Sequence, residues 1–260
     1  MSGRVILVID AHVADVRLNR PDKLNALDAA MFTEIAAAIE VIANTPKVRA
    51  VVLSGEGRAF CAGLDIEAMS GAGTGISLER RDYGPANLVQ HVAWGWRALP
   101  MPVIAAVHGI AFGGGLQISS GADIRIGEER TRFAIRETHW GLVPDMAGTA
   151  LWKSLVRDDV LRELTYTARE FDGEEAQKYG FLTRLSADPH DEALGLAKTI
   201  AERSPDAVRA CKRLLNLAAD ADPATILKAE SLEQLQLKGA SNQIEAIRAN
   251  MEKRIGEFAD

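Results

Sequence analysis

Two short and nearly continuous apolar runs constrain the fold of this chain more than any other feature. Val48–Leu53 and Val103–Val107 are rich in β-branched residues and have the composition of strands that are buried on both faces. A third strand is predicted at Ala122–Ile126, after a short helical stretch. Parallel strands need crossover connections, which are usually helices, so the alternation predicts an α/β fold.

The segment before the first run predicts a hairpin and a helix. Val5–Ile9 and Val13–Leu18 are β-rich and are separated by only three residues, Asp10–His12. A helix is expected to begin after Asp28, whose side chain can accept a hydrogen bond from the first turn. Its buried stripe is formed by residues three or four positions apart: Met31, Ile35, Ile39 and Ile42.

The C-terminal part of the chain has a different character. Helices are predicted at Glu192–Arg203, Pro205–Asn216, Pro223–Leu237 and Ser241–Phe258. We therefore divide the chain into an α/β core at residues 1–185 and a helical region at residues 186–260. The last two helices carry more apolar residues than one core needs, which favours an interface: Leu232, Leu235, Leu237, Ile244 and Ile247. The glycine-rich segment Glu67–Pro85 is expected to be a surface loop.

Charge and composition exclude several classes of protein. Lys and Arg number 30 and Asp and Glu 36, so the net charge is −6, and no run of basic residues offers a nucleic-acid surface. No apolar run approaches the roughly 20 residues of a membrane span, and the start has no signal-peptide pattern. The two cysteines and the acidic residues show no metal-ligand spacing. We expect a cytoplasmic enzyme without a metal or membrane span.

Two glycine-bearing segments follow the buried strands. Ala59–Asp65 comes after the first run and His108–Gln117 after the second. Ligands of α/β sheets bind outside the carboxyl ends of strands, so both segments are well placed for a site. Gly113–Gly115 exposes backbone N–H groups that can hold a phosphate or a developing oxyanion, or it allows close packing of helix and strand. Neither segment matches a dinucleotide fingerprint or a hydrolase nucleophile elbow.

A third segment, Phe133–Thr149, holds two carboxylates eight residues apart, Glu137 and Asp145. Apolar surroundings raise the pKa of a carboxyl toward the range useful for proton transfer. Two structural alternatives stay open. Glu137 can pair with Arg132 or Arg136, and Asp145 can cap a following helix.

Three reactive side chains near these segments are interpreted as structural. His108 and His139 are isolated histidines near strand ends, which are more often hydrogen-bonded structural groups than bases. Cys61 has no neighbouring histidine that would activate it as a nucleophile.

The ordered set of motifs resembles the enoyl-CoA hydratase/isomerase (crotonase) superfamily over nearly the whole chain. The matching segments, in chain order, are Leu18-Asn19-Arg20-Pro21, Leu24-Asn25-Ala26-Leu27, Phe60-Cys61-Ala62-Gly63-Leu64-Asp65, Ala106-Val107-His108-Gly109, Gly113-Gly114-Gly115, Gly121-Ala122-Asp123, Phe171-Asp172-Gly173-Glu174-Glu175-Ala176, Gly180-Phe181 and Met251-Glu252-Lys253-Arg254.

The resemblance implies a fold and a substrate. Residues 1–185 would form a spiral of ββα units that binds an acyl-CoA thioester, and residues 186–260 would form trimers or dimers of trimers. Coenzyme A would be part of the substrate, with no separate cofactor. Carried over by position, the backbone N–H groups of Ala62 and Gly114 would bind the thioester oxygen. The other substrate-binding positions would be Gly63, Leu64, Asp65, Gln117 and, near the coenzyme A phosphates, Lys253.

One departure from the family pattern indicates the reaction type. Hydratases of the family use two glutamates, and here Gln117 takes the first position while Glu137 matches the second. Asp145 stands where hydratases usually have glycine and some dienoyl-CoA isomerases carry an acid. The pair of Glu137 and Asp145 therefore predicts a double-bond isomerase, with both carboxylates and Gln117 facing one cavity. The alternatives are an enoyl-CoA hydratase in which Asp145 replaces the missing glutamate, and a degenerate acyl-CoA-binding subunit.

Overall fold

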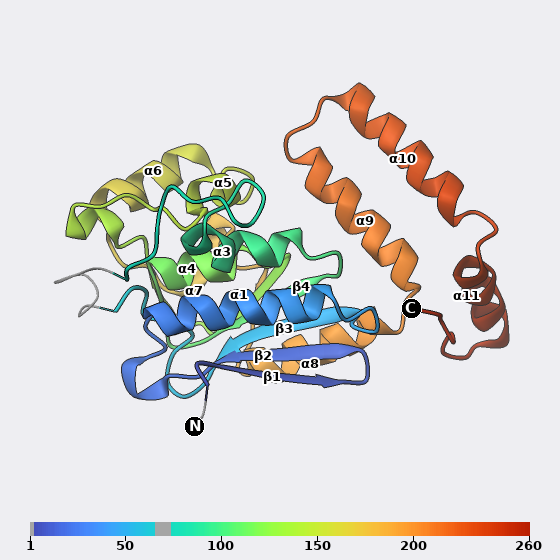
Figure 1. The fold of residues 1–260 in the computed structure, drawn as a ribbon, viewed down its shortest axis with the longest axis horizontal. Coiled ribbons are helices and arrows are strands. Elements are labelled where there is room, and N and C mark those ends of the chain that lie inside the picture. The colour runs from blue at the N-terminus through green and yellow to red at the C-terminus, as the bar shows by residue number, and fades with distance from the viewer. Residues whose placement is uncertain (1–2, 66–73) are drawn as a thin grey trace.

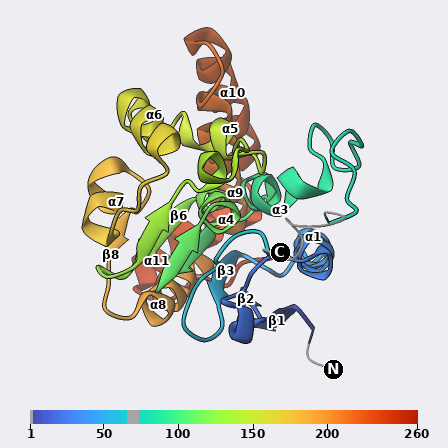
Figure 2. The same ribbon diagram turned by 90° about the vertical axis from the view of Figure 1, so that its left-hand side faces the viewer.

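The computed structural model describes residues 3–65 and 74–260, and the main sheet of this part has six strands in the order β1-β2-β3-β4-β6-β8. Figure 2 shows them running from β1 near the N-terminus to β8 beside α7. The strands are β1 (Val5–Asp10), β2 (Val13–Leu18), β3 (Ala50–Gly55), β4 (Val103–Val107), β6 (Ile124–Gly127) and β8 (Arg184–Leu185). β1 and β2 form the predicted hairpin, and the other pairs are parallel.

Helices cover both faces of this sheet. On one face, α1 (Ala29–Ala43) packs against α3 (Leu88–Ala98), and the predicted stripe of α1 is buried. The side chain of Asp28 accepts a hydrogen bond from the Met31 amide at 2.8 Å, so the expected cap is confirmed. On the other face, α8 (Pro189–Ala201) buries Ala193 and Ala197 against β3 and β4. Burial on both faces explains the continuous apolar runs of the two strands.

Shorter elements follow the carboxyl end of β4. A second sheet pairs β5 (Ile110–Phe112) with β7 (Arg132–Ala134) in parallel. The helical elements of this region are α4 (Gly114–Ser120), η2 (Glu137–Trp140), α5 (Gly148–Trp152), α6 (Asp158–Thr167) and α7 (Gly173–Tyr179), and η1 (Pro21–Lys23) follows β2. These elements bring Glu137 and the Asp145 segment next to α4.

The helical extension begins later than the change in sequence character suggests. Because α8 packs on the sheet, only α9 (Pro205–Ala218), α10 (Pro223–Leu237) and α11 (Ser241–Glu252) lie outside the α/β body (Figure 1). Lys212 holds α9 against the body. Its buried Nζ donates to the Met101 carbonyl at 2.8 Å and to Asp123 Oδ2 at 2.7 Å.

The end of the chain returns toward the sheet. Arg49 is buried and donates from Nε to Asp260 Oδ1 at 2.6 Å and from Nη2 to the Phe258 carbonyl at 2.8 Å. The predicted last helix is too long, because α11 ends at Glu252 and Lys253 adopts a left-handed φ of 54°. No helix in the described part of the chain is long and apolar enough to cross a membrane.

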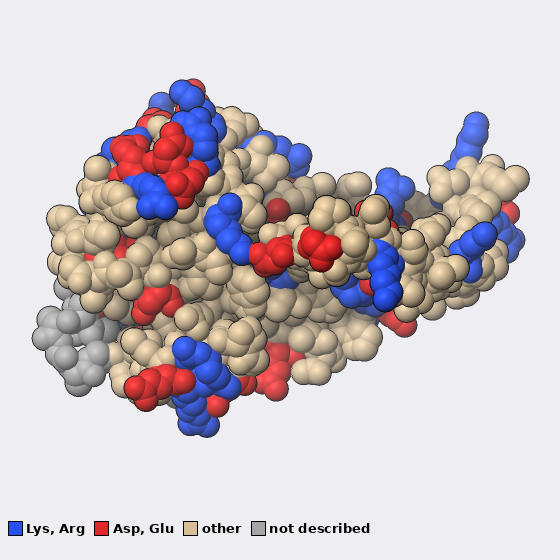
Figure 3. Space-filling model, turned by 90° about the horizontal axis from the view of Figure 1, so that it is seen from above, with Lys and Arg blue, Asp and Glu red and all other residues tan. Residues whose placement is uncertain are grey.

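Two surface expectations can be compared with the structure. Leu232, Leu235, Ile244 and Ile247 are exposed as predicted, whereas Leu237 is half-buried. Seen from above, basic and acidic side chains are interspersed over this face of the molecule (Figure 3). Residues 67–73 of the predicted loop lie outside the described residues, and residues 74–85 contain no helix or extended strand.

Candidate active site

Gln117 connects the two segments that carry the candidate carboxylates. Its side chain lies in α4 and is fully buried. The Oε1 atom accepts hydrogen bonds from the backbone N–H groups of Met146 and Gly148, both at 2.9 Å. The Nε2 atom donates to Oε1 of Glu137 at 2.6 Å. Gln117 therefore packs against Glu137 and does not open to a cavity, contrary to the sequence-based expectation.

Glu137 is a half-buried carboxylate with one unused oxygen. Its Oε1 is occupied by Gln117, whereas Oε2 is buried and has no hydrogen-bond partner among the described residues. Burial is the main cause that raises the pKa of Glu137, and the charge of Asp145 raises it further. A carboxyl of this kind can hold or accept a proton closer to neutral pH than an exposed glutamate.

The arginines next to Glu137 in sequence do not neutralise it. Arg132 and Arg136 both form ion pairs with Glu170, and the Arg136 guanidinium lies 4.8 Å from the centre of the Phe112 ring. The alternative in which Glu137 pairs with one of these arginines is therefore wrong. Glu170 keeps both positive charges away from the candidate site.

Asp145 does not cap a helix. α5 begins at Gly148 after Ala147, which has a left-handed φ of 67°, and no side chain caps it. The Asp145 residue is exposed, yet the protein atoms around it still raise the pKa of its carboxyl. The charge of Asp145 also contributes to the raised pKa of Glu137, after the larger effect of burial. Asp145 therefore lies near enough for its charge to act on Glu137, and the capping alternative is contradicted.

The glycine run allows the surrounding segments to approach α4 closely. A Cβ atom on Gly114 would lie 2.6 Å from Sδ of Met146 and 2.8 Å from Cδ1 of Leu27. A Cβ atom on Gly113 would lie 3.2 Å from Oε1 of Glu137. Close packing, one of the two interpretations of this run, is therefore correct. The second interpretation, that backbone N–H groups of this run bind an anion, depends on whether those N–H groups already have hydrogen-bond partners.

The predicted oxyanion donor Ala62 is wrong, because its N–H donates to the Leu24 carbonyl at 2.9 Å. Leu27 is bonded to the two residues that flank Leu64, donating to the Gly63 carbonyl at 2.8 Å and accepting from the Asp65 N–H at 3.0 Å. The N–H of Leu64 has no hydrogen-bond partner among the described residues. Sequence reasoning placed the donor on the wrong side of Gly63.

The free amide of Leu64 lies beside that of Gly114. A Cβ atom on Gly63 would lie only 3.4 Å from the Gly114 nitrogen, so the Gly63–Leu64 peptide is next to the start of α4. Gly114 is the first residue of α4, where an N–H has no partner within the helix, and it donates to no other described residue. Two unused backbone donors at adjacent positions can stabilise one negatively charged oxygen.

Asp65 stabilises this segment. It is buried, and its Oδ2 accepts a hydrogen bond from Nη1 of Arg20 at 2.5 Å. The same Arg20 nitrogen donates to the Ala26 carbonyl at 3.1 Å. These contacts fix the backbone around Gly63 and Leu64, so the family motif at Asp65 has a structural role here.

Two of the three side chains interpreted as structural, His108 and Cys61, have a structural partner or suppressed reactivity, whereas His139 is exposed and contacts the edge of the Trp140 ring. His108 Nε2 lies 3.0 Å from the Gly57 carbonyl. Burial raises the pKa of the Cys61 thiol to about 12, which keeps it neutral and a poor nucleophile. Lys253 follows α11, which lies on the opposite side of the molecule from α4 (Figure 1), so one protomer does not bring it to the other site residues.

Comparison with known proteins shows the family to which the chain belongs. A family model described as enoyl-CoA hydratase/isomerase matches residues 8–260. A short-chain-enoyl-CoA hydratase from Clostridium acetobutylicum is 35% identical over 257 residues, which is 97% of this chain and 96% of the relative.

Two further relatives cover most of the chain. The mitochondrial Delta(3,5)-Delta(2,4)-dienoyl-CoA isomerase of Rattus norvegicus is 32% identical over 262 residues, covering 94% of this chain and 77% of the relative. The crystal structure of an enoyl-CoA hydratase from Bacillus anthracis superposes with a TM-score of 0.87 at 28% identity, covering 98% of each chain. The protein belongs to the enoyl-CoA hydratase/isomerase family.

Proposed function

We propose that the protein is a double-bond isomerase that acts on an enoyl- or dienoyl-CoA thioester. The observation that carries this proposal is the half-buried Glu137 carboxyl, whose Oε1 accepts from Gln117, whose Oε2 has no partner among the described residues, and whose pKa is raised by burial and further by the charge of Asp145. A glutamine side chain cannot take or give a proton at neutral pH. The site thus offers two proton carriers for moving a proton between two carbons.

The reaction needs only proton transfer and charge stabilisation. The thioester oxygen would accept hydrogen bonds from the N–H groups of Leu64 and Gly114. One carboxylate removes a proton from a carbon near the thioester, and the electron pair of the broken C–H bond delocalises onto the thioester oxygen. The other carboxyl then protonates a carbon further along the conjugated system. No atom is lost and no redox step occurs. Each N–H donor in such a site is worth about 3–4 kcal/mol in the transition state.

The acyl chain of the bound substrate would extend along three exposed apolar side chains, which we call the apolar rim. Trp140, Leu142 and Val143 lie between the two carboxylates in sequence and are all more than half exposed, at 52%, 51% and 71%. Apolar side chains at this position suit a hydrocarbon chain, since its burial is favourable. The rim therefore supports an acyl substrate but does not define its length.

Hydration is the second candidate function. The relative from Clostridium acetobutylicum is named a hydratase, and Asp145 could supply the second carboxylate that adds water. A degenerate acyl-CoA-binding subunit is the third candidate, but the two uncompensated carboxyls argue for chemistry. The three candidates give different products, so one experiment distinguishes them.

The experiment is to incubate the protein with 2-enoyl-, 3-enoyl-, 2,5-dienoyl- and 3,5-dienoyl-CoA and to follow absorbance and mass. Isomerisation changes the absorbance when a conjugated product forms and leaves the mass unchanged. Water addition raises the mass by one water molecule. A mass increase as the main product supports the hydratase, and binding without turnover supports the degenerate subunit; either result contradicts the isomerase proposal.

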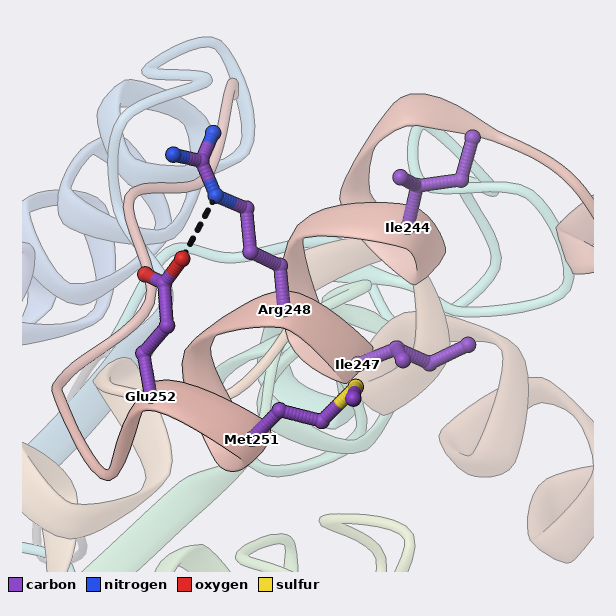
Figure 4. A pocket seen from close by; sticks show the side chains of 5 residues that line it. All are labelled: Ile244, Ile247, Arg248, Met251 and Glu252. Atoms are coloured by element: carbon purple, nitrogen blue, oxygen red, sulfur yellow. Dashed lines mark hydrogen bonds and ion pairs between the residues drawn. The ribbon is translucent and has the colours of Figure 1, made fainter.

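We also propose that the extension assembles the protein into homotrimers. An open groove of about 420 Å³ on α11 is lined by Ile244, Ile247, Arg248, Met251 and Glu252 (Figure 4). Ile244, Ile247 and Met251 are 55%, 52% and 80% exposed, which is typical of an interface that one chain leaves uncovered. In such an assembly, Lys253 of one protomer could reach the coenzyme A phosphates bound to its neighbour.

A further inference from the structure

We infer that Gln117 is a positioning residue that determines which oxygen of Glu137 exchanges the proton and that ties the Asp145 segment to it. The inference rests on the proposed function, in which Glu137 transfers a proton. The contacts are those of Gln117 with Met146, Gly148 and Glu137 described above.

The orientation of the Gln117 amide is fixed by its backbone partners. One end of the amide faces two N–H groups, those of Met146 and Gly148, and only the carbonyl oxygen can accept from both. The NH2 end must then face Glu137, where it donates at 2.6 Å. The surroundings keep this orientation, because Gln117 is fully buried.

This orientation makes the two oxygens of Glu137 unequal. Oε1 must stay an acceptor as long as it faces the NH2 group, so a proton on Glu137 has to reside on Oε2. Oε2 is the buried oxygen that has no partner among the described residues. The substrate proton is therefore exchanged at Oε2, and Gln117 itself neither takes up nor releases a proton in the reaction.

The same side chain holds the backbone segment that follows Asp145. Asp145 directly precedes Met146, whose N–H is held by Gln117, and Gly148 is held two residues further on. One buried amide thus fixes both the orientation of the Glu137 carboxylate and the backbone that follows Asp145. Asp145 is a charged group that acts on Glu137. The neighbouring arginines in sequence, Arg132 and Arg136, form ion pairs with Glu170.

Gln117→Glu is the decisive variant. The new carboxyl would place an oxygen against Oε1 of Glu137, and two carboxylates at this separation cannot both ionise. We expect a carboxyl that stays protonated at least one pH unit higher than Glu137 of the wild type. Turnover at neutral pH should fall about tenfold for each pH unit by which the pKa of this carboxyl exceeds the assay pH. KM should stay unchanged, because Gln117 is buried away from solvent.

The titration is measured by infrared spectroscopy of the protonated carboxyl band in the absence of substrate. Glu137→Gln identifies the band, and Ser120→Ala is the matched control. Ser120 is a buried side chain of the same helix that bonds the Leu116 carbonyl at 2.7 Å and Trp152 Nε1 at 2.8 Å, and neither partner is a carboxylate. We expect Ser120→Ala to lower the thermal stability and leave the carboxyl titration unchanged.

A measurement on the wild type covers the case in which Gln117→Glu does not fold. The side-chain NH2 resonances of Gln117 in 15N-glutamine-labelled protein should shift with the same midpoint as the Glu137 band. Equal titrations in wild type and Gln117→Glu, or NH2 resonances that ignore Glu137, would overturn the inference. Because neither readout needs turnover, lack of isomerase products would contradict the proposed function alone.

Discussion

The side-chain amide of Gln117 donates to Oε1 of Glu137 at 2.6 Å, while Oε2 of the same carboxylate is buried without a partner among the described residues. A carboxylate with one fixed and one free oxygen is suited to moving a proton at a defined position. Since the charge of Asp145 also raises the pKa of Glu137, these two carboxyls are the groups that we propose as proton carriers.

Replacing Glu137 with Gln should lower isomerase turnover by roughly 10²-fold or more, because a placed proton carrier contributes about 10²–10⁴ in rate. The fold should persist, since the glutamine oxygen can still accept from Gln117. Steady-state kinetics with far-ultraviolet circular dichroism measure both. Glu174→Gln is the control, because Glu174 is an exposed carboxylate on α7. Near-normal turnover in Glu137→Gln would exclude Glu137 from the chemistry.

Asp145→Asn should lower turnover to a similar extent without changing the melting temperature. If Asp145 only capped a helix, the substitution would be silent, because asparagine caps about as well as aspartate. The N-cap of α5 is Ala147, so we expect a loss of kcat. Kinetics and thermal unfolding of the same preparation decide this, and unchanged kcat would favour a site that uses Glu137 alone.

The stability of the protein should depend on pH through Glu137. Burial raises the pKa of Glu137 from its ordinary value of 4.5, so folding favours the protonated form. Glu137 therefore stabilises the folded protein at a pH below 4.5, its ordinary pKa. This stabilisation is lost as the pH rises through the raised pKa of the folded state.

Thermal unfolding across this window checks the sign. Glu137→Gln should be more stable than wild type at pH 8, and the difference in melting temperature should shrink as the pH falls toward 4.5. Glu174→Gln should follow the wild type throughout. A difference that grows on acidification would contradict the raised pKa.

Gly63→Ala should damage both stability and turnover. Gly63 has a φ of 89°, and an added Cβ would lie 2.7 Å from the Phe112 carbonyl oxygen and 3.4 Å from the Gly114 nitrogen. Gly84 has a φ of 63° with nothing within 4 Å, so Gly84→Ala isolates backbone strain, about 1–2 kcal/mol. We expect Gly63→Ala to be less stable than this control and to lose kcat by moving the Leu64 amide. Equal melting temperatures and turnover would contradict this packing.

Ile247→Glu should weaken the proposed trimer. Ile247 is 52% exposed in the groove on α11, and a charge there would be buried by an apolar partner surface. Light scattering after size exclusion should give a multiple of 28.1 kDa for the wild type and a smaller mass for the variant. Val8→Glu, at an exposed residue of β1, is the control. A wild-type monomer at micromolar concentration would contradict the assembly.

Local patterns in the sequence determined the elements and the family. The continuous apolar runs of β3 and β4, the hairpin of β1 and β2 and the cap at Asp28 depend on neighbouring residues, so the sequence predicts them. The resemblance to the family, which the ordered motifs indicated, is likewise confirmed by the family model over residues 8–260.

The tertiary structure decided which atoms of these motifs are free to act. Hydrogen bonding of the Ala62 amide to Leu24, which leaves the amide of Leu64 unused, depends on how two distant segments pair. Arg132 and Arg136 form ion pairs with Glu170 and not with Glu137. The side chain of Gln117 is occupied by hydrogen bonds with Glu137, Met146 and Gly148. A hydrogen-bond donor or acceptor is available for chemistry only if no nearer partner satisfies it, and partners far apart in sequence are brought together by folding alone.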